Sequence, residues 1–151
     1  YDIKSLDFES RADLEGVKES AAQVEALIEA QIESGIPSER IVLAGFSQGG
    51  VIALHLAPRY ANKFAGVIAL STYMCEPSLL GSEAKDTNRE TPIMMAHGEQ
   101  DEVVPVFMGN AAFKTLSESG FNATWQTYTM QHNVCMQELN DISAWLQKVL
   151  G

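Results

Sequence analysis

The sequence IVLAGFSQGGVIALHLA, residues 41–57, determines which fold we expect for the whole chain. It begins with four apolar residues, which are typical of a strand buried on both faces of a parallel sheet. Gly45 and Gly49 then flank Ser47 in the pattern G-x-S-x-G, a tight strand-to-helix turn that exposes a serine hydroxyl. We expect a β-carbon at either glycine to clash in that turn. Gln48 opens the helix that follows, where its backbone N–H could bind a developing oxyanion.

The G-x-S-x-G pattern is a weak signal by itself, because glycine and serine are common residues. A glycine-rich turn with an incidental serine is therefore the alternative interpretation. The context favours a functional serine, since an apolar strand precedes the pattern and an apolar segment of helical length follows it as far as Pro58.

Composition and charge restrict the class of protein. The chain has 151 residues, of which 46% are hydrophobic and 20% charged, as expected for one globular domain. Ten basic and twenty acidic residues give a formal net charge of −10, which argues against nucleic acid or an anionic membrane surface as a partner. No apolar run is long enough to span a membrane. The two cysteines suit a reducing compartment, so we expect a cytoplasmic protein.

Helical periodicity is clear on both sides of the central stretch. It predicts helices over residues 13–34, 48–57, 105–119 and 136–149, each followed by a glycine or proline. Residues 1–12 lack a clear period and are interpreted as a connecting segment. The last helix is expected to pack through one apolar face, made of Met136, Leu139, Ile142, Leu146 and Val149.

Apolar runs predict further strands over residues 64–70, 92–96 and 123–129, the last at a sheet edge because its polarity is mixed. The long polar stretch 71–91 is interpreted as a functional loop, a lid on the substrate side. Strands that alternate with helices indicate βαβ units. The sequence therefore predicts a single α/β domain, residues 1–151, with a mainly parallel sheet flanked by helices on both faces.

Three polar residues follow strands of this sheet at positions that suit a catalytic triad. Ser47 follows the first strand, Asp101 the third and His132 the fourth. Open parallel sheets bind ligands at the carboxyl ends of their strands, and the chain order serine, aspartate, histidine is that of the α/β-hydrolases. Serine needs an adjacent imidazole as general base, and the imidazole needs a carboxylate that fixes its tautomer.

The other two histidines are weaker candidates for the base. His55 lies two turns along the helix after Ser47, where a packed helical histidine is the simpler interpretation. His97 ends the third strand, where a structural hydrogen bond is favoured over catalysis. A solvent-exposed loop position is the alternative for His132 itself.

The carboxylate is less well determined by spacing. Glu99 and Glu102 share the loop of Asp101, so all three acids stay open at this point. Asp101 could also be a carboxylate that only shapes the turn before Pro105. Cys135 follows His132 closely, but it lacks a strand-to-helix turn and is interpreted as a small buried apolar residue.

Three motifs together make the chain recognisable: GFSQGG at residues 45–50, HGEQDEVVP at 97–105 and MQHNVC at 130–135. They resemble the acyl-protein thioesterase/carboxylesterase family (phospholipase/carboxylesterase type) of the α/β-hydrolase superfamily. The segments YDI at 1–3 and GVIALSTY at 66–73 look like the bacterial carboxylesterases of that family. The resemblance covers essentially the whole chain.

The resemblance implies a role for each site residue. Ser47 would be the nucleophile, Asp101 the triad acid, His132 the base, and the Gln48 N–H one oxyanion donor. The family acts on carboxylic esters, lysophospholipids and acyl thioesters of proteins, without a cofactor or metal. We also expect substrate contacts from three residues that follow strands, namely Thr72, Tyr73 and Val104.

The resemblance is incomplete at the start of the chain. Family members carry, ahead of the Tyr-Asp-Ile segment, further strands and an HGLG-type motif that supplies the second oxyanion donor. We therefore expect an N-terminally truncated α/β-hydrolase, the C-terminal two thirds of the family pattern. Its first strand would be an apolar sheet edge that associates with the missing N-terminal segment or with a second copy. A catalytically silent binding module and a hydrolase of lactones or peptides are the alternative functions.

Overall fold

The computed structural model describes the backbone of residues 3–151 and the side chains of residues 14–151. Its helices are α1 (Ile3–Glu33), α2 (Gln48–Leu56), α3 (Leu80–Glu83), α4 (Val106–Glu118) and α5 (Met136–Leu150). Short 3-10 turns occur at η1 (Ser38–Arg40), η2 (Ala57–Arg59) and η3 (Pro77–Leu79). The strands are β1 (Val42–Phe46), β2 (Gly66–Leu70), β3 (Ile93–Gly98) and β4 (Ala123–Tyr128).

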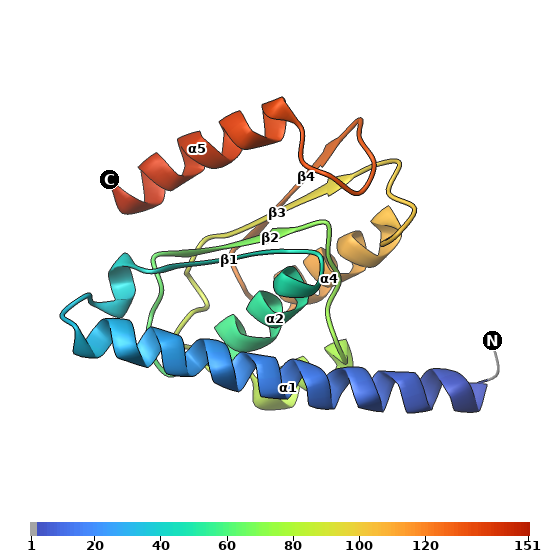
Figure 1. Ribbon diagram of the computed structural model, residues 1–151, viewed down its shortest axis with the longest axis horizontal. Helices are drawn as coiled ribbons and strands as arrows, with labels where there is room; N and C mark the ends of the chain where they lie inside the picture. Colours follow the sequence, from blue (N-terminus) through green and yellow to red (C-terminus); the bar gives the residue numbers. More distant parts are fainter. Residues whose placement is uncertain (1–2) are drawn as a thin grey trace.

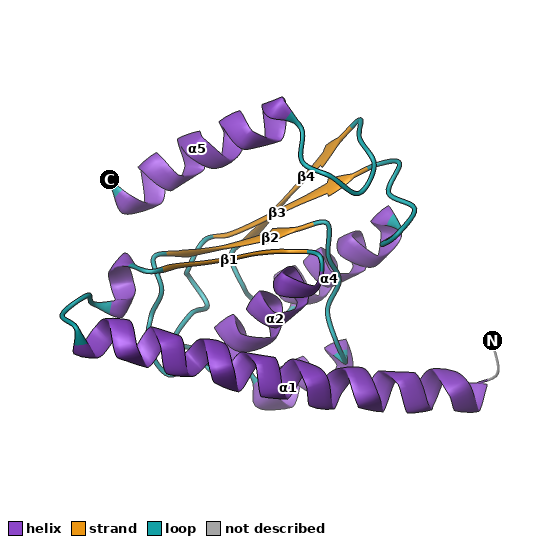
Figure 2. Cartoon of the chain, in the orientation of Figure 1, coloured by secondary structure: helices purple, strands orange, loops and turns teal. Residues whose placement is uncertain are grey.

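These strands form one parallel sheet in the order β1-β2-β3-β4, which confirms the predicted parallel α/β arrangement (Figure 1). Helix α2 packs against β1 and β2, α4 packs against β3 and β4, and α1 lies outside α2. Helix α5 lies alone on the other face of the sheet (Figure 2). As expected from its polarity, β4 is an edge strand. The carboxyl ends of all the strands therefore meet at one end of the sheet.

The main hydrophobic core lies between the sheet and the α2/α4 layer. Strand residues alternate between the two faces of a sheet, so Val67 and Met95 point into this core together, where Leu54 of α2 and Leu116 of α4 are also buried. Gly120, with a φ of 87°, ends α4 as predicted. No helix among the described residues is long and apolar enough to cross a membrane.

Helix α1 is longer than predicted. It begins at Ile3 instead of residue 13, so the interpretation of residues 1–12 as a connecting segment is wrong from Ile3 onward. Residues 3–12 contain neither glycine nor proline, and nothing in their backbone stops the helix. The predicted end is correct, because Gly35 has a φ of 108° that terminates the helix.

The stretch 71–91 is only partly a loop at the carboxyl ends of the strands. Parallel strands require a crossover connection, so the chain must return along the length of the sheet between β2 and β3. Asn88 already lies at the opposite end, where its buried Oδ1 accepts a hydrogen bond from the Phe64 N–H at 2.9 Å. The interpretation as a substrate-side lid is therefore wrong for the second half of this stretch.

Helix α5 has the predicted bounds but packs through a different face. Met136 and Leu139, expected in the core, are 70% and 49% exposed, whereas Glu138 is fully buried. The sheet is instead met by Trp145, whose ring would lie 2.4 Å from a β-carbon at Gly66. The apolar stripe and the sheet-facing stripe are both compatible with helical spacing, and only the tertiary packing distinguishes them.

Strand β1 is the second edge of the sheet. Ala44 is exposed and Phe46 is 39% exposed, so the prediction of a strand buried on both faces is wrong for this structure. The reason is geometric: the contacts of α5 with the sheet lie at Gly66 of β2 and Tyr128 of β4, and the Ala44 side chain of β1 is left exposed. The prediction that this strand forms an apolar sheet edge is correct.

Candidate active site

Ser47 sits in a sharp turn between β1 and α2. Its φ of 55° and ψ of −116° are strained for a residue with a β-carbon, which is the conformation expected of a G-x-S-x-G serine. Its N–H donates to the Leu70 carbonyl at 2.8 Å, and its carbonyl accepts the N–H groups of Gly50 and Val51. The turn is thus fixed to β2 on one side and to α2 on the other.

A β-carbon would clash at two glycines of this turn, Gly45 and Gly50, whereas the prediction named Gly45 and Gly49. A β-carbon at Gly45 would lie 2.2 Å from the Gly49 carbonyl group, as predicted. A β-carbon at Gly49 itself would meet nothing within 4 Å, so the predicted clash there is wrong. The second tight position is Gly50, where a β-carbon would lie 2.7 Å from Cβ of Thr72.

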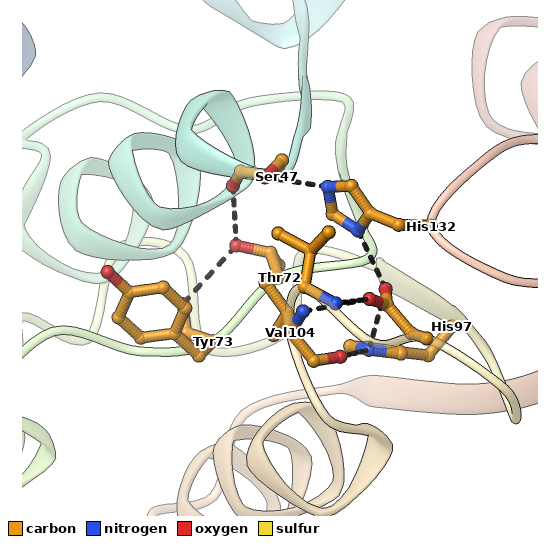
Figure 3. A network of polar contacts seen from close by, with 8 residues as sticks. Ser47, Thr72, Tyr73, His97, Val104 and His132 are labelled. Carbon is orange, nitrogen blue, oxygen red and sulfur yellow. Dashed lines mark hydrogen bonds and ion pairs between the residues drawn. The ribbon is translucent and has the colours of Figure 1, made fainter.

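Ser47, His132 and Asp101 come together at the carboxyl ends of β1, β4 and β3 (Figure 3). Nδ1 of His132 lies 2.7 Å from Oδ2 of Asp101, and Nε2 lies 3.0 Å from Oγ of Ser47. A carboxylate only accepts hydrogen bonds, so Nδ1 carries the ring proton and Nε2 has a free lone pair. That lone pair can accept the proton of the Ser47 hydroxyl. The geometry is that of a nucleophile, a base and an orienting acid.

Asp101 is buried but well supplied with donors. Its Oδ1 accepts the backbone N–H groups of Val103 and Val104, both at 2.8 Å, and its Oδ2 accepts His132. Burial alone would raise its pKa, but the hydrogen bonds from His132, Val104 and Val103 outweigh burial and hold the pKa below its ordinary value. Asp101 is therefore an anion that can stabilise a positive charge on His132.

The alternative residues lie elsewhere. Glu99 and Glu102 are exposed, and it is Asp101 that accepts the hydrogen bond from His132. His55 is buried in α2, where burial lowers its pKa to about 4, which agrees with a packed helical histidine. His97 is also buried and donates to the backbone near Asp101.

The expected substrate-contacting residues divide into two groups. Thr72 is buried and donates from Oγ1 to the Ser47 carbonyl at 2.7 Å, and Val104 is buried beside Asp101. Both support the site instead of lining an open surface. Tyr73 is half-buried and lines an apolar pocket. The Gln48 N–H, at the first position of α2, has no partner within the helix and is free to meet an oxyanion.

That pocket lies between the segment after β2 and α4, and its volume is about 190 Å³. It is lined by Tyr73, Met74, Pro77, Phe107, Met108, Ala111, Ala112 and Thr115. Almost all of the exposed lining is apolar, so the pocket suits a short hydrocarbon group and not a charged one.

Sequence reasoning missed several contacts that shape the site. The ring of Phe46 packs on the His132 imidazole with centroids 4.8 Å apart. By contrast, the amides of Val103 and Val104 donate to Asp101, so the carboxylate also shapes the turn before Pro105, as the sequence alternative had it. The hydroxyl of Thr72 had no comparable signal, because its contact depends on the neighbouring strand.

Comparison with known proteins identifies the family of this chain. A model of the phospholipase/carboxylesterase family matches residues 1–150. Acyl-protein thioesterase 1 of Gibberella zeae is 39% identical over 99% of this chain and 67% of its own length. Acyl-protein thioesterase 1 of Neurospora crassa is 40% identical over 99% of this chain and 64% of its own length.

Solved structures agree as well. Arabidopsis thaliana SOBER1 superposes with a TM-score of 0.84 at 29% identity, over 89% of this chain and 65% of that one. Esterase PE8 superposes with a TM-score of 0.85 at 26% identity, over 93% of this chain and 65% of that one. The chain thus spans about two thirds of the length of the relatives it matches. With the family match extending from residue 1 to residue 150, this chain belongs to the phospholipase/carboxylesterase family of α/β-hydrolase fold.

Proposed function

We propose that the protein is a serine hydrolase that cleaves carboxylic esters or acyl thioesters through an acyl-enzyme on Ser47. The observation that carries this proposal is the hydrogen-bonded series Ser47–His132–Asp101 at a strained strand-to-helix turn. Each member has the partner that its role requires, and the three come from different loops of the same sheet end.

The reaction runs in two halves. Oγ of Ser47 bonds to the acyl carbon while Nε2 of His132 takes its proton, and collapse of the tetrahedral intermediate releases the alcohol or thiol with that proton. Water then attacks the acyl-enzyme, with His132 again acting first as base and then as acid. The products are a carboxylic acid and free Ser47. Asp101 stays ionised throughout and stabilises the imidazolium.

The pocket and the relatives support a proposal for the substrate class. Both fungal relatives are named acyl-protein thioesterase 1, so we propose an acylated protein, a lysophospholipid or a small ester as substrate. The apolar pocket beside Tyr73 would receive the acyl side of the scissile bond. We assign one oxyanion contact to the Gln48 N–H; a second donor would come from outside the described residues. On the basis of cysteine content, we propose that the protein acts in the cytoplasm.

Fluorophosphonate labelling followed by peptide mapping tests the assignment. We expect the reagent to modify Ser47. The Ser47→Ala variant should resist labelling and should lose hydrolysis of an aryl ester, apart from a low residual activity due to substrate binding. Ser71, which is also strained, with a φ of 51°, is the matched control, and Ser71→Ala should still be labelled. A label that maps to Ser71 would overturn the assignment of the nucleophile.

A second candidate is a catalytically silent module that binds or oligomerises. It is favoured by one observation, the open apolar edge of β1 in a chain that spans two thirds of its relatives. Turnover separates the two candidates. A folded protein that neither reacts with the fluorophosphonate nor hydrolyses an aryl ester would support the silent module.

A further inference from the structure

His97 lies at the carboxyl end of β3, directly before the loop that carries Asp101. Only 1% of its surface is exposed, and its side chain faces the α4 layer. Its Nε2 lies 2.7 Å from the Val104 carbonyl and 3.4 Å from Oδ2 of Asp101 (Figure 3). Two imidazoles, those of His97 and His132, therefore approach the same carboxylate oxygen.

The tautomer of His97 follows from its partners. A carbonyl oxygen only accepts hydrogen bonds, so Nε2 carries the proton and Nδ1 has the lone pair. Nδ1 is buried and has no hydrogen-bond partner among the described residues. It faces Gly109 of α4, where a β-carbon would lie only 2.5 Å away, and the ring of Trp125 lies 5.9 Å from the imidazole. Nδ1 therefore has no polar partner that orients the ring, and the hydrogen bond from Nε2 to the Val104 carbonyl does so.

The turn from Asp101 to Val104 is fixed by hydrogen bonds at both the backbone N–H and the backbone carbonyl of Val104. The N–H of Val104 donates to Oδ1 of Asp101, and its carbonyl accepts the N–H of His97. The side chain of Val103 is 67% exposed, so the middle of the turn has little packing of its own. The bond from His97 ties the Val104 end of this turn to β3, while at the other end the Asp101 N–H donates to the Gly98 carbonyl at 3.3 Å. A displacement of this turn would therefore also turn Oδ2 of Asp101 away from His132.

The neighbours of the His97 ring come from three elements. Among the described residues, Asp101 is the titratable group in contact with the ring, while Gly109 of α4 and Trp125 of β4 pack against it. An N–H donor from β3 therefore reaches the turn that carries the carboxylate.

We propose that His97 is a positioning residue that acts through the Asp101–Val104 turn to aim Oδ2 of Asp101 at His132. The proposal rests on the hydrolase function proposed above, but it can be tested in the resting protein. A merely structural histidine would contribute to stability alone, whereas a positioning residue also controls the hydrogen bond between His132 and Asp101.

Four variants separate these roles. His97→Leu removes the donor and keeps an apolar side chain, and His97→Gln restores an N–H near the place of Nε2. Gly109→Ala leaves every polar group intact but pushes on the ring through the new β-carbon. His55→Leu is the matched control, because it makes the same change at a buried histidine away from Asp101.

Two measurements are made on each variant that circular dichroism shows to be folded. The first is the low-field proton resonance of the His132 Nδ1–H, which reports the bond to Asp101 without turnover. The second is the pH dependence of kcat/KM for an aryl ester. For His97→Leu we expect loss or an upfield shift of the resonance, kcat lower by about 10- to 100-fold with KM little changed, and an acid-side midpoint at lower pH.

Gly109→Ala should change both readouts in the same direction, and His97→Gln should recover most of kcat. His55→Leu should lower the melting temperature at most. If His97→Leu and Gly109→Ala leave the resonance and the midpoint unchanged, His97 is only structural and the proposal is wrong. If the wild-type protein hydrolyses no ester, the proposed function fails, while the resonance still decides the role of His97.

Discussion

Asp101 combines burial with an ionised carboxylate, and three donors make this combination stable. Asp101→Asn would keep the shape of the site, but its amide could donate to His132 and favour the wrong tautomer. We therefore expect a folded protein whose kcat is lower by about 10⁴-fold. The check is steady-state hydrolysis of an aryl ester alongside the melting temperature.

The exposed neighbours of Asp101 provide the controls for this experiment. Glu99→Gln and Glu102→Gln change a charge in the same loop without touching His132, so their turnover should stay close to that of the wild type. Near-normal turnover in Asp101→Asn, with a loss in one of the glutamate variants, would transfer the role to that glutamate.

Glu138 is a second buried acid, and it lacks the donors that Asp101 has. Both of its carboxylate oxygens are buried without a partner among the described residues. Burial, with a smaller contribution from the charge of Asp141, raises the pKa of Glu138 to about 7. The folded protein holds this proton at pH values where the unfolded chain has released it, so the free energy of unfolding falls as the pH rises between about 4.5 and 7.

This predicts a pH-dependent difference between the wild type and Glu138→Gln. The variant stays neutral, so it should gain stability relative to the wild type as the pH rises from about 5 to 8, by at most about 3 kcal/mol. Thermal or urea unfolding across that range measures the difference. The exposed Glu118→Gln is the control and should follow the wild-type curve. A constant difference between Glu138→Gln and the wild type at all pH values would contradict the prediction.

Among the elements, the sequence predicts those with strong local signals. The strand-to-helix turn at Ser47, the ends of α1 and α4 at glycines, and the alternation of strands with helices follow from spacing and backbone chemistry. What fails depends on tertiary contacts. The face of α5 that meets the sheet is set by Trp145 against Gly66, and no local period distinguishes it from the stripe with Leu139.

The site follows the same rule. That Ser47, Asp101 and His132 come together is predictable because each follows a strand, and parallel strands bring their carboxyl ends together. The choice of Asp101 over Glu99 and Glu102 needed coordinates, because loop conformation decides which of three nearby acids turns inward. The contact of Thr72 with Ser47 likewise arises between neighbouring strands and has no signal in either segment.

Helix α4 forms one wall of the apolar pocket, which makes it the element that should control acyl length. Ala111 lines the pocket, and Ala111→Phe would fill part of its 190 Å³ volume. We expect kcat/KM for esters whose short hydrocarbon chain fills the pocket to fall by about 10-fold relative to kcat/KM for acetyl esters. Ser117→Phe, on an exposed part of the same helix, is the control and should leave the preference unchanged. An unchanged preference in Ala111→Phe would place the acyl group elsewhere.

For the molecule as a whole, the important feature is that β1 is an edge strand whose outward backbone groups have no neighbouring strand in the sheet. Ser47 N–H donates toward β2, so by the alternation of a strand the N–H and C=O groups of Ala44 and Phe46 point outward from the sheet edge. The apolar residues Met136 and Leu139 of α5 are exposed as well. An apolar edge with unpaired backbone groups is a template for another strand.

We therefore predict that these 151 residues associate, either with a strand-bearing segment of the kind that could occupy the remaining third of the relatives' length or with a second copy. The net charge of −10 opposes self-association, so salt should promote it.

Size-exclusion chromatography with light scattering should show dimers or larger species at high concentration. Ala44→Lys, which places a charge on the exposed edge strand, should reduce them, whereas Glu118→Lys should not. Without association, we expect ester turnover to be about 10²- to 10³-fold below that of a full-length relative, the effect of losing one oxyanion donor. A monomer at all concentrations with full turnover would show that β1 needs no partner.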